Sequence, residues 1–491
     1  MNFNSVFESL YIFAVVGLSL YGFNALLLTA LFLLSKHKRV PAAELNTDWP
    51  QVTVQLPIFN ERFVIRRLID VVAALDYPRD RLSIQVLDDS TDDTVRLARV
   101  RVEYHRMQGV DICHIHRADR KGAKAGAMAA ALPSAAGEFV VVFDADFMPP
   151  PDYLRRVMPA FANPRIGMVQ ARWGHINAPA TALTRVQAMA LDGHFVVEQT
   201  ARSRAGLFFT FNGSAGVWRK ACIEDAGGWQ ADTLAEDLDL SYRAQLRGWQ
   251  FRYLSEVVAP AEVPLQILAF KRQQFRWVKG SIQCLRKVGP AVLRSHNSAW
   301  RKLQALFHLG GYLVHPLMVL LLLASLPAML VEGLGSAALG ILSVAGLGPP
   351  VLYAVSQVSA YTDGWKRLVY FPLLMLLGAG IALNNSWAVA EALGGRNPTQ
   401  FLRTPKGESV AQQRQIGRDY ALLSDWTTLG ELLLAVYALV AVIVSLSREP
   451  GLAPFLLLFA LGFGYTASTG LLQSWQVLRQ RASWRTALGG D

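Results

Sequence analysis

The stretch "EFVVVFDADF", Glu138 to Phe147, is an apolar run that ends directly in two aspartates. A short continuous apolar run bounded by such residues is typical of a buried strand in a parallel sheet. Three related runs precede it, "VTVQLPIFNE", "LSIQVLDDSTDDT" and "VDICHIH", and helices are expected between them over 61–75, 92–107 and 123–133. Strand–helix alternation at this spacing predicts an α/β fold with a mostly parallel sheet.

Carboxylates follow two of these expected strands. Asp88 and Asp89 end one run, and Asp144 and Asp146 end another. In open parallel sheets ligands bind beyond the carboxyl ends of the strands. Two carboxylates spaced i and i+2 after a buried strand need a positive partner, commonly a hard divalent cation that carries phosphates. The alternative in both places is a solvated loop whose aspartates cap the next helix.

Three further segments carry residues suited to chemistry. "TLAEDLDLSYRAQLRGW" places Glu236 and Asp237 at the start of an amphipathic helix, where a carboxylate is either a general base or a favourable partner of the helix dipole. "RKGAKAGAM" offers Lys121 and Lys124 to an anionic ligand, or forms a solvated basic loop. "FNGSAGVWRK" has small residues that let the backbone approach a ligand, although an ordinary tight turn has the same composition.

Histidine and cysteine indicate no metal or redox centre. His114, His116, His175 and His194 lack a metal-ligand spacing and are interpreted as structural. The three cysteines are scattered without paired spacing, which favours a reducing compartment and predicts neither a disulfide framework nor a zinc site.

The composition is that of a membrane protein with one soluble region. Of 491 residues, 52% are hydrophobic and 17% are charged, against the ~25% usual for soluble domains. Residues 7–34 are nearly uncharged and exceed the ~20 residues that cross a bilayer. A retained anchor is expected, because no basic segment precedes this run and it is too long for a signal peptide. "SKHKR" follows it, so the positive-inside rule places the soluble region, about 48–299, in the cytoplasm.

Four more spans are expected after the soluble region, at Leu303–Val331, Ser336–Tyr361, Leu429–Leu446 and Leu452–Trp475. Leu368–Leu393 is ambiguous, because "NNS" interrupts it and basic residues flank it. If it crossed, the basic loop 394–426 would lie outside, against the positive-inside rule. We therefore expect it at the membrane interface, which gives five spanning helices in all.

The stretch "KRQQFRWVKGSIQCLRK", residues 271–287, carries six basic residues and no acidic one. The apolar residues Phe275, Val278 and Ile282, with Phe270 just before the stretch, are expected to face lipid or protein while the basic side chains reach headgroups or cytoplasm. A net charge of +11 would also suit nucleic acid, but much of the excess lies beside membrane spans, where topology and anionic lipids explain it. No nucleic-acid partner is predicted.

The order of these motifs resembles glycosyltransferase family 2, in the processive membrane branch that contains cellulose synthase. "LPIFNE", "LDDSTDD", "FDADF", the "ED" of "LAEDLDL" and a QxxRW signature at 273–277 occur in that order. The chain is most similar to the cellulose-synthase-like A and C enzymes of plants, which make mannan, glucomannan or glucan backbones, and to their bacterial relatives. "VQARWGHIN", "FNGSAGVWRK", "QQFRWVKGSIQ" and "FLRTPKG" carry that likeness, which covers nearly the whole chain.

The resemblance implies a GT-A (Rossmann-like) cytoplasmic domain inserted between transmembrane α-helices. The domains would be an N-terminal transmembrane helix (1–36), the glycosyltransferase domain (37–264), an interfacial amphipathic region with QxxRW (265–302) and a C-terminal transmembrane region (303–491). In cellulose synthases a cytoplasmic gating loop stands where this chain has "FLRTPKG". A cyclic-di-GMP-binding domain is not expected, and neither is control by that nucleotide in cis.

The family's site residues carry over to matching positions. Residues binding the nucleotide sugar would be Asp88 and Asp89 near the nucleoside, with Glu61, Lys124 and Asp144. Asp146, with Asp144, would hold Mg²⁺ or Mn²⁺ on the diphosphate.

On the acceptor side, Asp237, beside Glu236, would deprotonate the acceptor hydroxyl and invert the anomeric configuration. Gln273, Arg276 and Trp277 would face the acceptor and the diphosphate.

The function expected is an inverting, metal-dependent hexosyltransferase that extends a β-glycan from UDP-glucose or GDP-mannose, in a β-1,4 linkage, and passes it through its own helices. The same carboxylates would serve transfer of one sugar to a membrane lipid such as ceramide or diacylglycerol, and a non-catalytic scaffold or transporter is a third reading. The location expected is the inner (plasma) membrane, multi-pass, with the catalytic domain in the cytoplasm; a periplasmic partner stays unknown.

Overall fold

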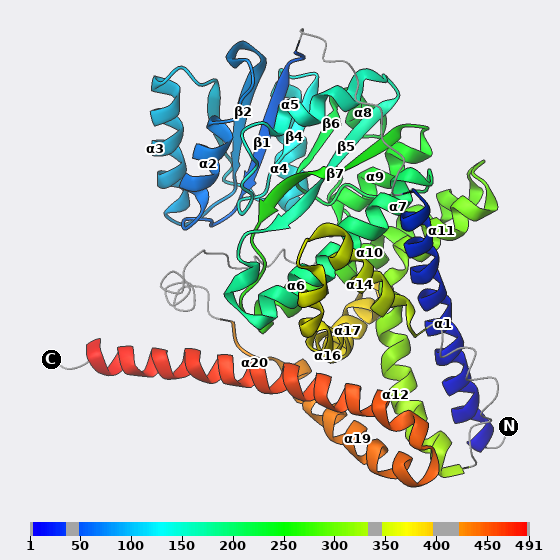
Figure 1. Ribbon diagram of the computed structural model, residues 1–491. Helices are drawn as coiled ribbons and strands as arrows, with labels where there is room; N and C mark the ends of the chain where they lie inside the picture. The colour runs from blue at the N-terminus through cyan, green and yellow to red at the C-terminus, as the bar shows by residue number, and fades with distance from the viewer. Residues whose placement is uncertain (1–2, 36–48, 332–345, 396–421, 489–491) are drawn as a thin grey trace.

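An α/β domain lies on a layer of long apolar helices in this computed structural model (Figure 1). The structure describes residues 3–35, 49–331, 346–395 and 422–488. The gating-loop stretch "FLRTPKG" lies outside the described residues.

The domain contains a seven-stranded sheet in the order β3-β2-β1-β4-β6-β5-β7. Strands β1, β2, β3 and β4 pair in parallel, as do β5 and β7, while β6 is antiparallel to β4 and β5. The prediction of a mostly parallel sheet is confirmed, with β6 as the exception. The strands are β1 Val52–Ile58, β2 Leu82–Asp88, β3 Ile112–His116, β4 Phe139–Val142, β5 Ile166–His175, β6 Gly216–Arg219 and β7 Gln250–Ala261.

Apolar side chains on both faces of the sheet explain why these runs form central strands. All residues of β1 and β4 are buried, and helices pack on each face to form two apolar clusters. The helices of the domain are α2 Ile65–Ala73, α3 Thr94–Met107, α4 Ala123–Ala131, α5 Tyr153–Val157, α6 Ala182–Asp192, α7 Gln199–Arg204, α8 Lys220–Asp225 and α9 Glu236–Leu246.

The helix predicted over 61–75 begins later, at Ile65. Asn60 has φ of 56°, a left-handed conformation that a helix cannot contain. Its backbone N–H donates to Ser90 Oγ at 2.8 Å, and its side-chain oxygen accepts from the Thr91 N–H at 2.8 Å. The residues after β1 therefore form a loop that is joined to the loop after β2.

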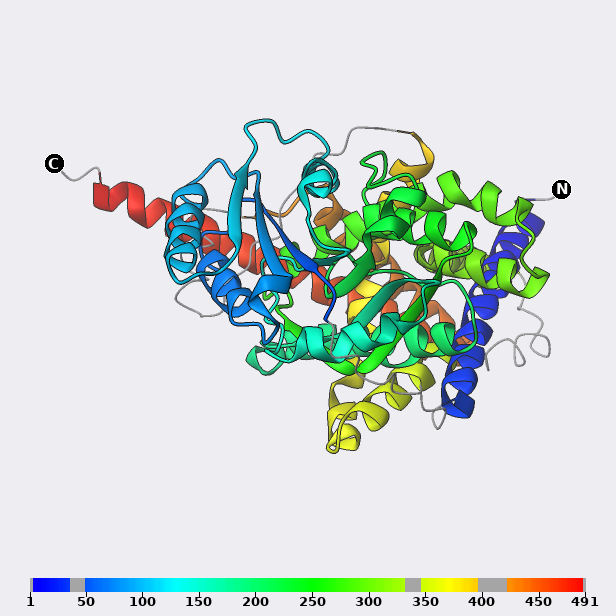
Figure 2. The same ribbon diagram turned by 90° about the horizontal axis from the view of Figure 1, so that it is seen from above.

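The other helices that the structure describes lie below or beside the domain, and the long apolar ones, among them α1, α12, α19 and α20, lie below it (Figure 1). They are α1 Phe3–Ser35, α10 Ile267–Arg294, α11 Ala299–Leu309, α12 Val314–Val331, α14 Gly348–Ala360, α15 Gly364–Arg367, α16 Phe371–Gly380, α17 Ala382–Leu393, α19 Trp426–Arg448 and α20 Ala453–Leu488. Seen from above, α1 and the C-terminal half of α20 lie at opposite ends of the molecule (Figure 2).

Among the described residues, five helical segments are long and apolar enough to cross a membrane: Val6–Ser35, Gly311–Leu330, Gly364–Leu393, Trp426–Arg448 and Pro450–Arg479. The span predicted from Leu303 starts at Gly311 instead, since α11 ends at Leu309 before a short turn. The helix of the predicted span Ser336–Tyr361 is described only from Gly348 and has 13 residues, and residues 332–345 lie outside the described residues. The segment predicted at the interface, 368–393, is long and apolar enough to span, but it is divided between α16 and α17.

Candidate active site

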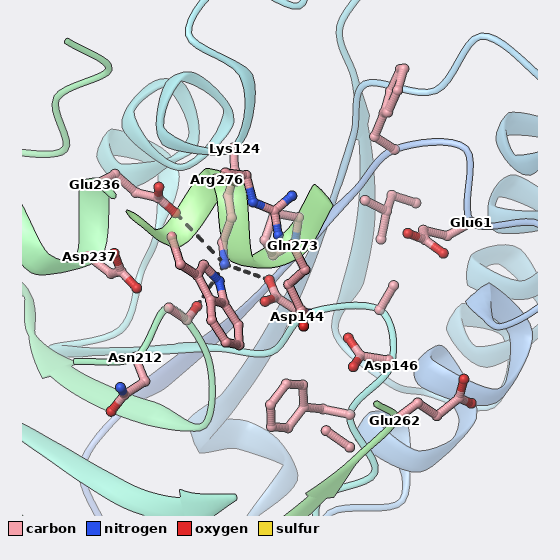
Figure 3. A pocket seen from close by; sticks show the side chains of 18 of the residues that line it. Glu61, Lys124, Asp144, Asp146, Asn212, Glu236, Asp237, Glu262, Gln273 and Arg276 are labelled. Carbon is pink, nitrogen blue, oxygen red and sulfur yellow. Dashed lines mark hydrogen bonds and ion pairs between the residues drawn. The ribbon is translucent and has the colours of Figure 1, made fainter. Parts of the chain in front are cut away.

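A pocket opens at the carboxyl ends of β1 and β4, between the sheet, the start of α9 and the first half of α10 (Figure 3). Its lining contains seven carboxylates and three cationic side chains. The carboxylates are Glu61, Asp89, Asp144, Asp146, Glu236, Asp237 and Glu262, and the cations are Arg120, Lys124 and Arg276.

Strand β4 delivers two of these carboxylates. Asp144 and Asp146 follow its buried residues directly, and the Asp144 N–H donates to Ser214 Oγ at 2.9 Å. The Asp146 residue is 3% exposed, while a third of the Asp144 side chain is accessible. Both lie in the same pocket, so the sequence prediction that they act together is geometrically feasible.

Lys124 lies between Asp144, which follows β4, and Glu236 at the start of α9 (Figure 3). Its Nζ is 2.5 Å from Asp144 Oδ1 and 3.9 Å from Glu236 Oε1, and it donates to the Gly213 carbonyl at 2.8 Å. Burial by itself would lower the pKa of Lys124, but the carboxylates of Asp144 and Glu236 outweigh it and raise that pKa. Lys124 is therefore a cation held between the strand-end carboxylates and α9.

Asp237 has the environment of a base. Burial, followed by the charge of Glu236, raises the pKa of Asp237 to about 7, against the opposing effect of Lys124. Its Oδ1 accepts the N–H of Leu238 at 2.8 Å. Gly213 faces it at φ 81°, where an added Cβ would lie 3.0 Å from Asp237 Oδ2. Gly213, the first glycine of "FNGSAG", is thus required both by its backbone conformation and by the close approach of this carboxylate.

Helix α10 contributes Gln273, Arg276 and Trp277 to the opposite wall. Trp277 faces the cavity, as the sequence analysis expected. Burial lowers the pKa of Arg276, against the raising effect of carboxylates that include Glu236, Asp144 and Asp237. The three QxxRW side chains and the two carboxylates of α9 therefore border one space.

The predicted role of the other basic residues of 271–287 is wrong for the two most buried lysines. Lys271 is 4% exposed and its Nζ lies 2.7 Å from Glu431 Oε1; Lys279 is 1% exposed and lies 2.8 Å from Glu391 Oε2. A buried ammonium needs a carboxylate partner, and α19 and α17 supply one each. These lysines bind membrane-region helices of the protein rather than lipid headgroups.

The apolar positions of the same helix also face protein. Val278 and Ile282 are buried against α17, with Phe275 packed beside them, and Phe270 joins a cluster with α6 and α16. The sequence left contact with lipid and contact with protein open for these residues, and the structure shows contact with protein.

The residues predicted to bind the nucleoside part of the donor separate into two groups. Asp89 and Glu61 line the pocket, and Asp89 pairs with Arg117 at 2.5 Å. Asp88 is fully buried and outside the lining; its Oδ1 accepts the Ser90 N–H at 2.8 Å and its Oδ2 lies 2.8 Å from His114 Nε2. These hydrogen bonds lower the pKa of Asp88 although burial, the largest single cause, would raise it. Its contacts place it beneath the loop that carries Asp89.

Several lining residues escaped sequence analysis. The guanidinium of Arg120 lies 3.5 Å from the ring centroid of Phe59, and Glu262, paired with Arg67 at 2.7 Å, enters from the end of β7. His175, interpreted as structural, pairs with Asp192 at 3.6 Å and also lines the pocket. Arg120 begins the basic stretch "RKGAKAGAM", of which the sequence analysis named only Lys121 and Lys124. No local pattern marks Glu262, because it reaches the pocket only through tertiary structure.

The donor set suits a hard divalent cation. Seven carboxylates and three cationic side chains line the pocket, and two of the carboxylates, Asp89 and Glu262, pair with Arg117 and Arg67 outside the lining. Among the described residues no group of three or more metal-ligating side chains converges. Two carboxylates, Asp144 and Asp146, would fit a cation that takes its remaining ligands from a diphosphate or from water.

Comparison with known proteins agrees with this arrangement. Residues 50–280 match the family described as "Glycosyltransferase like family 2". Glucomannan 4-beta-mannosyltransferase 2 of Arabidopsis thaliana is 44% identical over 268 residues, covering 53% of this chain and 50% of that protein. Glucomannan 4-beta-mannosyltransferase 1 of Oryza sativa subsp. japonica is 43% identical over 272 residues, covering 54% and 52%. The chain thus spans about half the length of the curated relatives it matches.

A solved structure supports the fold. The mannosyltransferase PcManGT from Pyrobaculum calidifontis, in complex with GDP-Man and Mn²⁺, superimposes with a TM-score of 0.55 over 80% of this chain and 100% of that one, at 22% identity. The sheet is a mixed, GT-A-like sheet of the Rossmann type, flanked by membrane-spanning candidates. The fold class expected from the sequence is confirmed.

Proposed function

We propose that residues 50–280 form a family 2 glycosyltransferase domain of the cellulose-synthase-like branch, and that the chain transfers a hexose from a nucleotide sugar to a growing β-glycan. The observation that carries the proposal is one pocket that joins the strand-end carboxylates, the buried Asp237 and the QxxRW side chains of α10 (Figure 3). The chain is a multi-pass membrane protein, and we place its catalytic domain on the cytoplasmic side of the plasma membrane.

On the donor side, Asp144 and Asp146 would hold Mg²⁺ or Mn²⁺. An ion held there would neutralise charge on the diphosphate leaving group. Lys124 adds a fixed cation beside Asp144, and Arg276 brings a second one from α10. The nucleoside would lie toward Asp89 and Glu61, in the part of the pocket that Phe59 and Arg120 border.

On the acceptor side, Asp237 accepts the proton of the attacking hydroxyl. Its raised pKa matches a base that works near neutral pH. Glu236, next to it, maintains that pKa and binds Lys124 through charge. The hydroxyl then attacks the anomeric carbon on the face opposite the diphosphate, so one displacement inverts the configuration. Asp237 needs no covalent intermediate for this step.

The relatives favour mannose among the hexoses. Two curated relatives are named as glucomannan 4-beta-mannosyltransferases, and the structural neighbour was solved with GDP-Man. We therefore propose GDP-mannose as the first donor to test, UDP-glucose as the second, and a β-1,4 linkage.

A polymer acceptor is favoured over a lipid by Trp277. An indole face in the pocket wall suits stacking on a sugar ring, and the helix that carries it, α10, packs against α17 of the apolar helices. The second candidate, transfer of one sugar to ceramide or diacylglycerol, uses the same carboxylates.

The test is product analysis with purified, membrane-reconstituted protein and each radiolabelled nucleotide sugar. We expect water-insoluble or high-molecular-weight material that a β-1,4-mannanase or glucanase degrades. Chloroform-soluble product of one fixed size would show the lipid acceptor instead, and absence of transfer from both donors would contradict the proposal.

A further inference from the structure

One face of α10 lies against the segment that carries Glu236 and Asp237. A Cβ added to Gly280 would come within 2.8 Å of Ala235 Cβ and 2.9 Å of Ala235 N. Three residues further, Gln283 Oε1 accepts the Leu234 N–H at 2.9 Å, and Cys284 Sγ donates to the Ala235 carbonyl at 3.4 Å. The backbone just before α9 is therefore in direct contact with α10, at a distance that only glycine permits.

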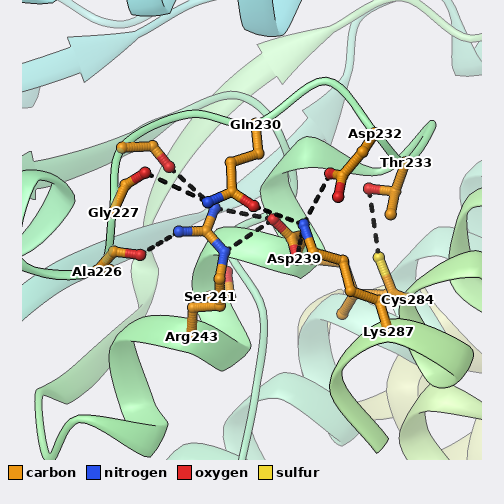
Figure 4. Close-up of polar contacts among 12 residues, drawn as sticks. Ala226, Gly227, Gln230, Asp232, Thr233, Asp239, Ser241, Arg243, Cys284 and Lys287 are labelled. Carbon is orange, nitrogen blue, oxygen red and sulfur yellow. Dashed lines mark hydrogen bonds and ion pairs between the residues drawn. The ribbon is translucent and has the colours of Figure 1, made fainter.

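Behind the base, the same two helices share a buried carboxylate, Asp239 (Figure 4). Asp239 is fully buried; its Oδ2 accepts from Arg243 Nε at 2.9 Å. Lys287 Nζ lies 3.0 Å from Asp239 Oδ1, as an ion pair rather than an aligned hydrogen bond. A fully buried carboxylate with a cation from each helix is costly to separate from either.

The two cations of Asp239 also bind the loop before α9. Arg243 donates to the carbonyl of Gly228 at 2.9 Å and to that of Ala226. Lys287 donates to Gln230 Oε1 and to Asp232 Oδ1, each at 2.7 Å. Figure 4 shows these contacts converging from the loop, α9 and α10. The loop and both helices thus form one cluster.

Helix geometry connects this cluster to the pocket. Residues in an α-helix turn by about 100° each, so Asp237 and Asp239 point in nearly opposite directions. On α10, Arg276 and Lys287 are eleven positions apart, three turns and about 20°, so they share one face. Holding Asp239 against Lys287 therefore fixes the rotation of α9 about its axis, which sets the direction of Asp237. It also fixes the position of α9 along α10, and so the position of Asp237 relative to Arg276.

We propose that Asp239 and Lys287, with the close contact at Gly280, are positioning residues that set the place of Asp237 relative to the QxxRW side chains. Neither side chain lines the pocket. The inference rests on the proposed function, because it takes Asp237 to be the base. A displacement of a reacting group by about 1 Å can cost ~100-fold in rate, so the cluster would act on turnover and not on donor binding.

The test compares pairs of variants in the full-length, reconstituted protein. Asp239→Asn and Lys287→Met remove one charge each, and Lys287→Arg keeps the charge. Asp232→Asn removes the exposed partner of Lys287; the side chain of Asp232 is 58% accessible. Gly280→Ala inserts one methyl group at the contact with Ala235, and Gly289→Ala inserts it in the same helix, where the nearest atom is 3.5 Å away.

We expect Asp239→Asn, Lys287→Met and Gly280→Ala to lower kcat by about 10- to 100-fold. The Kd for the nucleoside diphosphate should change less than about twofold, because the donor-side residues are untouched. Lys287→Arg should keep most of the wild-type kcat, and the controls Asp232→Asn and Gly289→Ala should have wild-type kcat. The double variant Asp239→Asn/Lys287→Met should lose no more kcat than the worse of its two single variants.

Wild-type kcat in both Lys287→Met and Gly280→Ala would overturn the inference while leaving the proposed function intact. Equal loss of kcat and of nucleotide binding would also overturn it, because that pattern belongs to general destabilisation. If Asp239→Asn does not fold, Lys287→Met decides, since that side chain is a quarter exposed. A wild-type protein that transfers no sugar would instead contradict the proposed function.

Discussion

The donor side and the acceptor side of the pocket are held in place in different ways. Asp144 and Asp146 follow β4, whose position in the sheet is fixed by backbone pairing with β1 and β6. Asp237 and Arg276 lie on two helices whose relative placement depends on side-chain contacts of α10. The donor side is thus positioned by the sheet, and the acceptor side by ion pairs and close packing between separate elements.

This difference predicts different weaknesses. On the donor side, Asp144 and Asp146 are the residues that we propose to bind a divalent cation from outside the chain. The acceptor side already contains its counter-charges, because α10 is paired at its start with α19, at its middle with α17 and near its end with α9. Its vulnerability lies in residues far from the reacting atoms.

The largest effect is expected from removing divalent metal. Chelation should reduce transfer to background, and Mn²⁺ or Mg²⁺ should restore it, since the strand-end carboxylates would otherwise repel the diphosphate. Asp146→Asn should raise the metal concentration needed for half-maximal activity in a metal titration. Asp152→Asn, an exposed aspartate of the same segment, is the control. Full turnover in excess chelator would contradict the donor-side assignment.

Asp237→Asn should abolish most transfer while nucleotide binding survives. Loss of a general base typically costs about 10²- to 10⁴-fold. Kinetics of transfer and a separate measurement of nucleoside diphosphate affinity would show the two effects apart. Full turnover in this variant would show that another group accepts the proton.

The far end of α10 gives a prediction on stability. Glu431 is fully buried against Lys271, so Glu431→Gln should cost about 3–5 kcal/mol by leaving the ammonium unpaired. Lys271→Met/Glu431→Leu should recover much of that loss, because no uncompensated charge remains. Thermal unfolding in detergent measures both. Asp225→Asn, which removes the exposed pair with Arg247, should cost about 1 kcal/mol or less.

The smallest effect is expected in the pH profile. Because the pKa of Asp237 is raised to about 7 and transfer requires the deprotonated carboxylate, kcat/KM should fall roughly tenfold per pH unit below neutrality. Glu236→Gln should move the midpoint to lower pH, since the charge of Glu236 contributes to raising that pKa. A midpoint that stays in place would mean that Asp237 does not control this limb.

Local patterns in the sequence were sufficient for the sheet and the strand-end carboxylates. Alternating apolar runs and helical segments specify parallel strands, and the aspartates that follow them must gather at one edge. The QxxRW side chains and Asp237 were also located correctly in space, although their roles stay predictions. The start of α2 was missed because Asn60 adopts a left-handed conformation that its loop partners, Ser90 and Thr91, stabilise.

What the sequence by itself determined is therefore the α/β domain, the long apolar segments and the order of the site residues. Only tertiary structure decided the partners of the basic residues on α10: Lys279 and Glu391 are 112 residues apart, and Lys287 and Asp232 are 55 apart. It also buried Asp88 and brought Glu262 into the pocket. The physical reason is that periodicity records which face of an element is buried, whereas the identity of a buried charge's partner depends on which distant element packs there.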